Sequence, residues 1–255
     1  QNKPPDARLI LVGDVDQLPS VGPGKVLSDI IECGGFPVVR LKTIFRQSEE
    51  SVIITNAHLI NQGVMPAIHQ EEGDFHFIPR LKGEEVSKSV VELCERIIPE
   101  GFGFDPFRDI QVISPMRKGE TGINHLNGLL QESLNPEDKD KPQKNLGSTV
   151  FRSGDRVMQV HNDYSMPWVM TDEKGKWSEG LGVYNGDQGI ILDIDLKQEI
   201  LTVRFDDNRT CEYSFDRLDS LELAYAITVH KSQGSEFPAV VIPLCAVPPV
   251  LVCRN

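Results

Sequence analysis

Apolar positions along the first 150 residues follow two alternating patterns, short buried runs and helical stripes. The run at 7–14 predicts a central parallel strand that ends at a Gly-Asp pair, and the runs at 38–41, 109–114 and 239–244 predict further strands. Helical spacing predicts helices over about 25–31, 49–61 and 84–98, and one that turns Ile123, Leu126, Leu130 and Leu134 inward. Strand, loop and helix in this alternation indicate an α/β layered domain.

The pattern changes after residue 134. Residues 135–148 are polar and predict an exposed loop, whereas 154–215 contain only short alternating strands, expected at 157–160, 188–194, 200–205 and 210–215. Turn residues such as Asn185-Gly186 separate these strands. The set predicts a small β-barrel inserted into the α/β domain, after which a helical pattern resumes near Leu221.

Composition narrows the class of protein. With 255 residues, 39% of them hydrophobic and 25% charged, the chain is typical of a globular domain or two. Its apolar runs are shorter than the roughly 20 residues of a membrane span, and its five cysteines are scattered without C-x-x-C spacing. We therefore expect a cytoplasmic protein with no membrane contact and no metal site. The net charge of −12 weighs against nucleic acid without excluding it, because binding depends on the local groove.

The first polar stretch, 13–25, begins where the predicted first strand ends. Gly-Asp-x-x-Gln at the carboxyl edge of a parallel sheet can bind a ligand, and Gln17 could bond a phosphate oxygen or orient water. The alternative is a plain turn with a solvated Gln17. The segment 22–25 resembles the end of a phosphate-binding loop, but Val26 stands where that loop needs a hydroxyl and Pro23 removes an amide.

Four further stretches contain residues that could contact a ligand, and most of them also have a purely structural interpretation. Arg46, between elements, could reach a transferring phosphoryl group or be a surface residue. The basic segment 115–119 could contact a nucleic-acid backbone or form an exposed turn. Residues 183–189 could be no more than an Asn-Gly turn. The segment 228–237 is so rich in hydroxyl, His, Lys and Gln donors that phosphate or sugar recognition is favoured.

Taken together and in this order, GDVDQLPSVGPG, FRQ, ISPMRKGETGINHLN, VYNGDQG and AITVHKSQGSE resemble the motif set of superfamily 1 helicases, most closely the RecD-like 5′→3′ branch. The resemblance implies an α/β fold, a parallel-sheet RecA-like helicase motor lobe with an inserted small SH3-like β-barrel. It implies the end of the first lobe (1A) at 1–45, the second lobe (2A) at 46–150, the SH3-like insert (2B) at 151–216, and the continuation of 2A at 217–255.

The resemblance also implies roles for individual residues. Gln17 would sense the γ-phosphate and Arg46 would reach the nucleotide from the second lobe, which makes both catalytic. Nucleotide contacts would come from Gly13, Asp14, Gln17, Arg46, Gly234 and Glu236, the last on the ribose. DNA contacts would come from Pro19, Ser20, Val21, Pro115, Arg117, Asn185, Gly186, Thr228, His230, Lys231 and Gln233. The cofactor would be ATP with Mg²⁺, and the partners single-stranded DNA, duplex junctions and further recombination or nuclease subunits.

Some parts of the motif set are missing from the 255 residues. The Walker loop and the Asp-Glu magnesium motif are expected before Gln1, and motif VI is not recognisable after the strand at 239–244. We therefore expect the chain alone neither to hydrolyse ATP nor to unwind DNA. Two alternatives stay open: a non-catalytic single-stranded nucleic-acid-binding module, in which Trp168, Trp177 and Tyr184 could stack on bases, and the helicase part of a conjugative relaxase.

Overall fold

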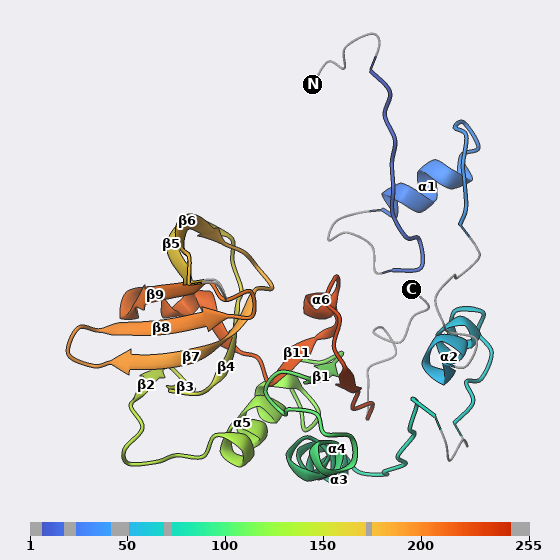
Figure 1. The fold of residues 1–255 in the computed structure, drawn as a ribbon. Helices are drawn as coiled ribbons and strands as arrows, with labels where there is room; N and C mark the ends of the chain where they lie inside the picture. The colour runs from blue at the N-terminus through green and yellow to red at the C-terminus, as the bar shows by residue number, and fades with distance from the viewer. Residues whose placement is uncertain (1–6, 18–23, 42–50, 69–72, 172–174, 246–255) are drawn as a thin grey trace. The chain divides into compact units, whose positions relative to one another are not determined.

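The computed structural model describes residues 7–17, 24–41, 51–68, 73–171 and 175–245. The chain forms two compact units: residues 1–79 with 248–255, and residues 80–247 (Figure 1). Each unit is a separate body and is described by itself. No helix in the described ranges combines the length and the apolarity that crossing a membrane requires.

The described part of the first unit contains the helices α1 (Val26–Glu32) and α2 (Val52–Asn61). The helix α2 begins where the Ser51 hydroxyl accepts the Ile54 amide and the Asp74 carboxylate accepts the amides of Val52 and Ile53. It ends before Gly63, whose φ of 73° is the left-handed value expected after a helix C-terminus. The helices predicted near 25–31 and 49–61 are thus confirmed where the structure describes them.

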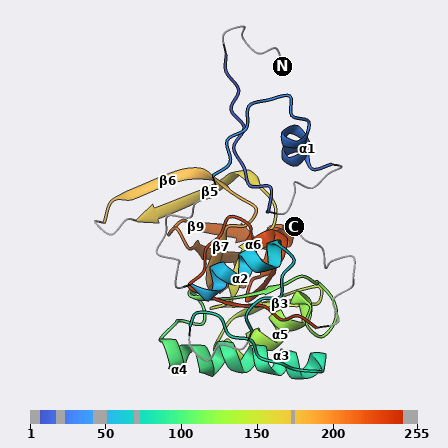
Figure 2. The same cartoon turned by 90° about the vertical axis from the view of Figure 1, so that its right-hand side faces the viewer.

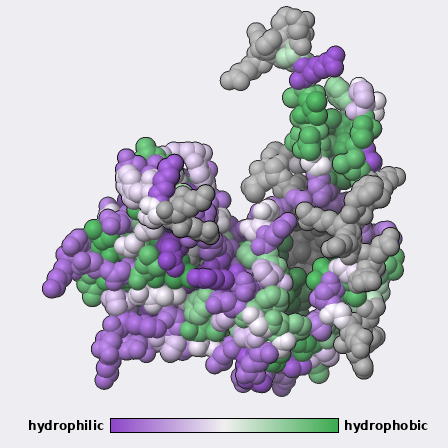
Figure 3. Space-filling model, viewed as in Figure 1, coloured by the Kyte–Doolittle hydropathy of each residue, from purple (hydrophilic) through white to green (hydrophobic). Residues whose placement is uncertain are grey.

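The strands predicted at 7–14 and 38–41 are wrong. Both segments are extended without strand pairing, and their apolar side chains face solvent: Val12 is 92% exposed and Val39 is 87% exposed. In Figure 3, hydrophobic residues gather on the visible surface of the first unit. A buried parallel strand needs hydrogen-bonded neighbours, and the described part of this unit contains no β-ladder. An apolar run indicates that a segment can be buried, but it does not show whether neighbouring strands are present to pair with it.

In the second unit a three-stranded parallel sheet lies against helices. The sheet order is β11-β1-β12, made of β11 (Ala226–Thr228), β1 (Ile110–Ser114) and β12 (Ala239–Val241). The covering helices are α3 (Gly83–Glu92), continued through a π turn (Leu93–Ile97) into α4 (Ile98–Phe102), and α5 (Ile123–Leu134). Val90 and Cys94 from one helix and Leu126 and Leu130 from the other pack on Val112. The predicted α/β layer with a parallel sheet is confirmed.

The rest of the second unit is a seven-stranded antiparallel sheet of order β10-β4-β7-β8-β9-β5-β6. Its strands are β4 (Arg156–Gln159), β5 (Asp163–Thr171), β6 (Trp177–Val183), β7 (Gln188–Asp195), β8 (Ile200–Phe205), β9 (Thr210–Ser214) and β10 (Leu221–Leu223). Alternate residues Leu201, Val203 and Phe205 enter its core, as period-two spacing requires. A 3-10 turn (Phe215–Ser220) links β9 to β10, and β2 (Gln143–Leu146) pairs with β3 (Thr149–Arg152) beside the sheet.

Two expectations for the antiparallel region need correction. The predicted barrel is not closed by the described strands, because the edge strands β10 and β6 do not pair with each other. The long β5–β6 hairpin (Figure 2) was missed because Pro167, Gly180 and Gly182 interrupt its alternation. Gly180 is needed there, since a Cβ would lie 2.4 Å from Cζ2 of Trp168.

The last errors concern the segments beside the sheet. Part of the predicted loop at 135–148 is the strand β2. The helix expected near Leu221 is instead β10, whose Leu221 pairs with Gln159. The strand predicted to reach residue 244 ends at Val241, before Pro243, which has no amide hydrogen to donate.

A buried carboxylate joins the antiparallel sheet to the helical layer. Asp155 is fully buried, and its oxygens accept hydrogen bonds from Gln131 (2.6 Å), Asn135 (2.8 Å), Tyr225 (2.9 Å) and the Arg152 amide (2.7 Å). These groups come from α5, from the turn before β4 and from the segment before β11. The network therefore fixes how the two layers of the second unit meet.

Candidate nucleotide and nucleic-acid interface

The Gly-Asp-x-x-Gln stretch forms a local turn in the first unit. The Asp14 carboxylate accepts the Asp16 amide at 2.9 Å and the Gln17 carboxamide at 3.3 Å, and all three residues are exposed. Gly13 lets α1 approach closely, because a Cβ would lie 2.8 Å from Leu27 Cδ2. Turn and ligand contact are thus compatible: Asp14 shapes the loop, and Gln17 presents a donor at the surface. Nucleotide contact by Gly13, Asp14 and Gln17 stays a prediction.

Several predicted contacts lie outside the described residues. These are Pro19, Ser20 and Val21, and the second catalytic candidate, Arg46. Gly234 and Glu236 belong to the second unit, whereas Gln17 belongs to the first. Nucleotide contact by all of these residues therefore stays a prediction.

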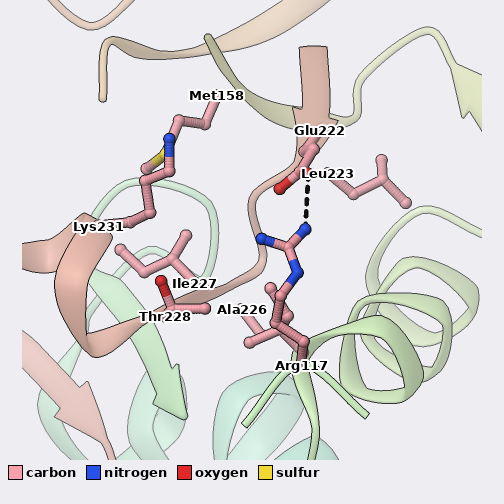
Figure 4. Close-up of a pocket in the computed structure, with 9 residues that line it drawn as sticks. Arg117, Met158, Glu222, Leu223, Ala226, Ile227, Thr228 and Lys231 are labelled. Atoms are coloured by element: carbon pink, nitrogen blue, oxygen red, sulfur yellow. Dashed lines mark hydrogen bonds and ion pairs between the residues drawn. The ribbon is translucent and has the colours of Figure 1, made fainter. Parts of the chain in front are cut away.

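A small pocket of the second unit is lined by both charged and apolar side chains, which come from several strands, two helices and the loop after β1. Arg117 comes from the loop after β1, Thr228 ends β11, and Lys231 lies in the following helix α6 (Val229–Ser232). Figure 4 shows Arg117 and Lys231 on opposite sides of the pocket, with Ile227 and Thr228 between them. The other lining residues are Ile123, Met158, Glu222, Leu223 and Ala226. Three of the predicted DNA contacts thus share one surface.

Lys231 connects this pocket to the antiparallel sheet. Its ammonium group donates to the side-chain oxygen of Asn185 and lies 3.5 Å from the Val160 carbonyl oxygen. Partial burial lowers the pKa of Lys231; Glu222 acts in the opposite direction and Arg117 adds to the lowering. The contact brings together two predicted DNA-binding residues that are 46 positions apart in the chain.

The turn that carries Asn185 is held rigidly. Gly186 has a φ of 102°, as the third position of a type II turn requires. The Asp187 carboxylate accepts the Tyr184 amide at 2.9 Å and the Arg209 guanidinium at 2.6 Å. The Asn-Gly pair is therefore a true turn, and its geometry presents Asn185 to α6.

Arg117 is already engaged by a carboxylate. Its guanidinium nitrogen lies 2.6 Å from the Glu222 carboxylate on β10, and both side chains are about half exposed. Ser114 fixes the start of the Arg117 loop by donating to the Thr121 carbonyl at 2.7 Å and accepting the Met116 amide at 3.2 Å. No spacing rule could have found Glu222, because the pair is 105 residues apart in sequence. Pro115, in the same loop, is half-buried.

The segment after Thr228 exposes most of its polar groups. His230, Gln233, Gly234 and Glu236 are all exposed. Gly234 has a φ of 81° and open space where a Cβ would be, so its backbone is accessible to a ligand. The predicted density of donors is thus presented at the surface of the second unit.

Three families of protein domain match this chain. The ATP-dependent RecD-like DNA helicase SH3 domain matches residues 126–205, the AAA domain matches residues 2–79, and the UvrD-like helicase C-terminal domain matches residues 223–252. The matches follow one another along the chain in the order of the motifs.

Similar proteins of known name are helicases or their relatives. The chain is 32% identical to the ATP-dependent RecD2 DNA helicase of Deinococcus radiodurans over 93% of its own length and 28% of that protein. It is 30% identical to the RecBCD enzyme subunit RecD of Mycobacterium tuberculosis, over 93% of the chain and 40% of that subunit. The chain thus spans well under half of either relative.

Two more distant likenesses complete the comparison. The conjugal transfer protein TraA of Rhizobium radiobacter is 26% identical over 90% of the chain and 19% of that protein. The solved structure of unliganded Pif1 from Bacteroides sp. covers 59% of this chain and 51% of its own, at 18% identity and a TM-score of 0.30, and no argument rests on it. By its domain matches and its named relatives, this chain belongs to the RecD-like superfamily 1 helicases, of which it carries part of the length.

Proposed function

We propose that this chain is the part of an ATP-dependent, RecD-like DNA helicase that contributes DNA contacts during 5′→3′ movement along a single strand. The observation that carries the proposal is the contact between Lys231 and Asn185, beside Arg117. Through this contact, polar side chains from three motifs that are far apart in sequence lie on one surface. Phosphate contacts from Lys and Arg position a nucleic-acid strand, which is what such a surface can do.

ATP with Mg²⁺ is the proposed cofactor, and its hydrolysis supplies the free energy for movement. The side chains of the first unit suit the nucleotide: Asp14 and Gln17 are both exposed, and the Gln17 carboxamide can donate to a phosphate oxygen. We propose that Gln17 and Arg46 act at the γ-phosphate and that Gly13, Gly234 and Glu236 border the nucleotide. In an enzyme with a complete motif set, Gln17→Ala should abolish unwinding while nucleotide binding persists.

Several finer assignments belong to the same proposal. The borders near residues 45, 150 and 216 would separate lobe 1A, the start of lobe 2A, an SH3-like 2B insert and the rest of 2A. Partners would be single-stranded DNA, duplex junctions and, by analogy with the RecBCD subunit among its relatives, further recombination or nuclease subunits. The 255 residues contain no G-x-x-x-x-G-K-[ST] sequence, so we propose that the chain alone does not hydrolyse ATP. DNA-stimulated ATPase by the purified chain would contradict this.

Binding of a labelled single-stranded oligonucleotide to the 255-residue chain, followed by fluorescence anisotropy across a salt series, tests the DNA contact. Lys231→Ala should weaken binding to all sequences alike and reduce the slope of log K against log salt by about 0.7. Lys197→Ala, an exposed lysine on the β7–β8 turn, is the matched control and should change neither quantity. Equal binding by the Lys231 variant and the wild type would refute the proposed contact.

The similarity to TraA favours a second candidate, the helicase part of a conjugative relaxase. Such a protein would also carry a relaxase domain that nicks DNA at a defined sequence. Sequencing the gene upstream of Gln1 distinguishes the candidates, since a His-rich relaxase domain there would favour this second one.

A further inference from the structure

Two exposed tyrosines stand together at one end of the β5–β6 hairpin. Tyr164 is 70% exposed and Tyr184 is 44% exposed. Their ring centroids are 5.8 Å apart and their planes meet at 71°, an edge-to-face pair. Both rings are therefore accessible to a ligand at the surface.

The pair is held in place by polar contacts beside it. The side-chain oxygen of Asn162 accepts the Asn185 amide at 2.9 Å, and its nitrogen lies 3.3 Å from the Tyr164 hydroxyl. The Tyr184 amide donates to Asp187, which belongs to the rigid turn described above. The rings thus sit on a fixed backbone, so little conformational entropy is lost when a ligand stacks on them.

The charged groups beside the tyrosines are a cation and two paired carboxylates. Asn185 follows Tyr184 in the chain and contacts the Lys231 ammonium. Arg217 pairs with Asp163 and Arg209 pairs with Asp187, so neither carboxylate is without a cation. A strand whose phosphates pass Lys231 would run beside the turn that carries Tyr184. Groove cations combined with aromatic rings are how proteins bind single-stranded nucleic acid, because every base has a face that can stack.

We propose that Tyr164 and Tyr184 form a base-stacking platform for single-stranded nucleic acid, positioned by Asn162 and continuous with the phosphate contact at Lys231. The inference rests on the proposed function and adds the part of the strand, its bases, that this end of the hairpin recognises. A protein partner is less well matched, since the exposed apolar residues Trp177 and Leu181 lie elsewhere on the hairpin. Trp177 pairs with Thr171, whereas the tyrosines flank the opposite end, where Asp163 pairs with Val183.

The test compares two strands of about 12 nucleotides, within the site sizes such proteins bind: oligo-dT and the same backbone without bases. Tyr164→Ala in the 255-residue chain should weaken oligo-dT binding about fivefold or more and leave binding of the abasic strand unchanged. Tyr164→Phe keeps the ring and should bind oligo-dT within about twofold of the wild type. Leu196→Ala, which removes an exposed apolar side chain on the β7–β8 turn, is the control and should bind normally.

The outcomes separate this inference from the proposed function. If the wild-type chain binds neither strand, the proposed DNA contact fails and the platform fails with it. If the wild type binds both strands equally, or Tyr164→Ala weakens both alike, the platform is refuted while the phosphate contact stands. Equal loss in the Phe and Ala variants would also refute stacking. A circular-dichroism melt of each variant shows that the sheet is intact.

Discussion

At the residue scale, the charge of the pocket depends on one acidic side chain. Glu222 binds Arg117 at 2.6 Å and also acts on the ionisation of Lys231. In a chain with a net charge of −12, such a carboxylate reduces the positive potential where phosphates would bind. Because exposed ion pairs stabilise a fold little, Glu222 affects ligand binding more than stability.

Glu222→Gln should therefore tighten binding of single-stranded DNA about two- to fivefold at low salt, because Arg117 is released to contact a phosphate. The steeper salt dependence that accompanies an added phosphate contact, measured by anisotropy titration, is the second sign. Glu212→Gln, which neutralises an exposed acid on β9, should have a much smaller effect. Unchanged or weaker binding by the Glu222 variant would show that Arg117 is not available to DNA.

Two buried thiols give a pH-dependent readout of packing. Burial raises the pKa of Cys94 and of Cys211 to about 12, whereas Cys33 is exposed. Only the thiolate reacts with iodoacetamide, so neither buried thiol should be alkylated in the native protein at pH 8 while Cys33 is. Peptide mass spectrometry measures this, and both should react once urea unfolds the chain. Rapid native alkylation of Cys94 would contradict the packing between α3 and α5.

At the scale of elements, helices and strands could be predicted where the residues within or next to the element determine it. The helix α5 has an apolar stripe, and α2 has a capping Ser51 and a glycine after its end, so their positions could be predicted. The segment at 7–14 has an apolar run but pairs with none of the residues that the structure describes, and the prediction of a strand failed there. The hairpin β5–β6 was missed because Gly180 is required by the packing of Trp168, which no local pattern shows.

The candidate site was predictable in its residue types but not in its geometry. Lys231, Asn185 and Arg117 were recognised from motifs, each in its own segment. That Lys231 contacts Asn185 depends on how the antiparallel sheet docks on the parallel one. Glu222 and Tyr164 were missed because each acts through a partner in another strand or turn.

The docking of these layers should be sensitive to Asp155. Asp155→Asn replaces a carboxylate that accepts four hydrogen bonds by an amide whose nitrogen cannot accept, so buried donors lose their acceptor. We expect a loss of about 2–4 kcal/mol in the free energy of unfolding, measured by urea denaturation. Asp193→Asn, on an exposed position of β7, should cost less than about 0.5 kcal/mol. Equal stability of both variants would mean that the network does not hold the layers together.

At the scale of the whole molecule, the chain consists of two units that both carry candidates for the proposed chemistry. The nucleotide candidates Gly13, Asp14 and Gln17 lie in the first unit. Gly234 and Glu236, together with the described DNA contacts, lie in the second. The chain spans 28% of the RecD2 relative and 40% of the RecD relative, so movement along DNA would be a property of a larger assembly of domains. DNA binding by the second unit is the property that the 255 residues can display directly.

Hydrogen–deuterium exchange of the 255-residue chain with and without single-stranded oligo-dT is the direct test of DNA binding by the second unit. We predict that DNA slows exchange in peptides covering 115–119, 162–164, 184–187 and 228–234, and leaves the far end of the β5–β6 hairpin and α3 unchanged. Protection confined to other segments, or none at DNA concentrations that saturate binding, would contradict it.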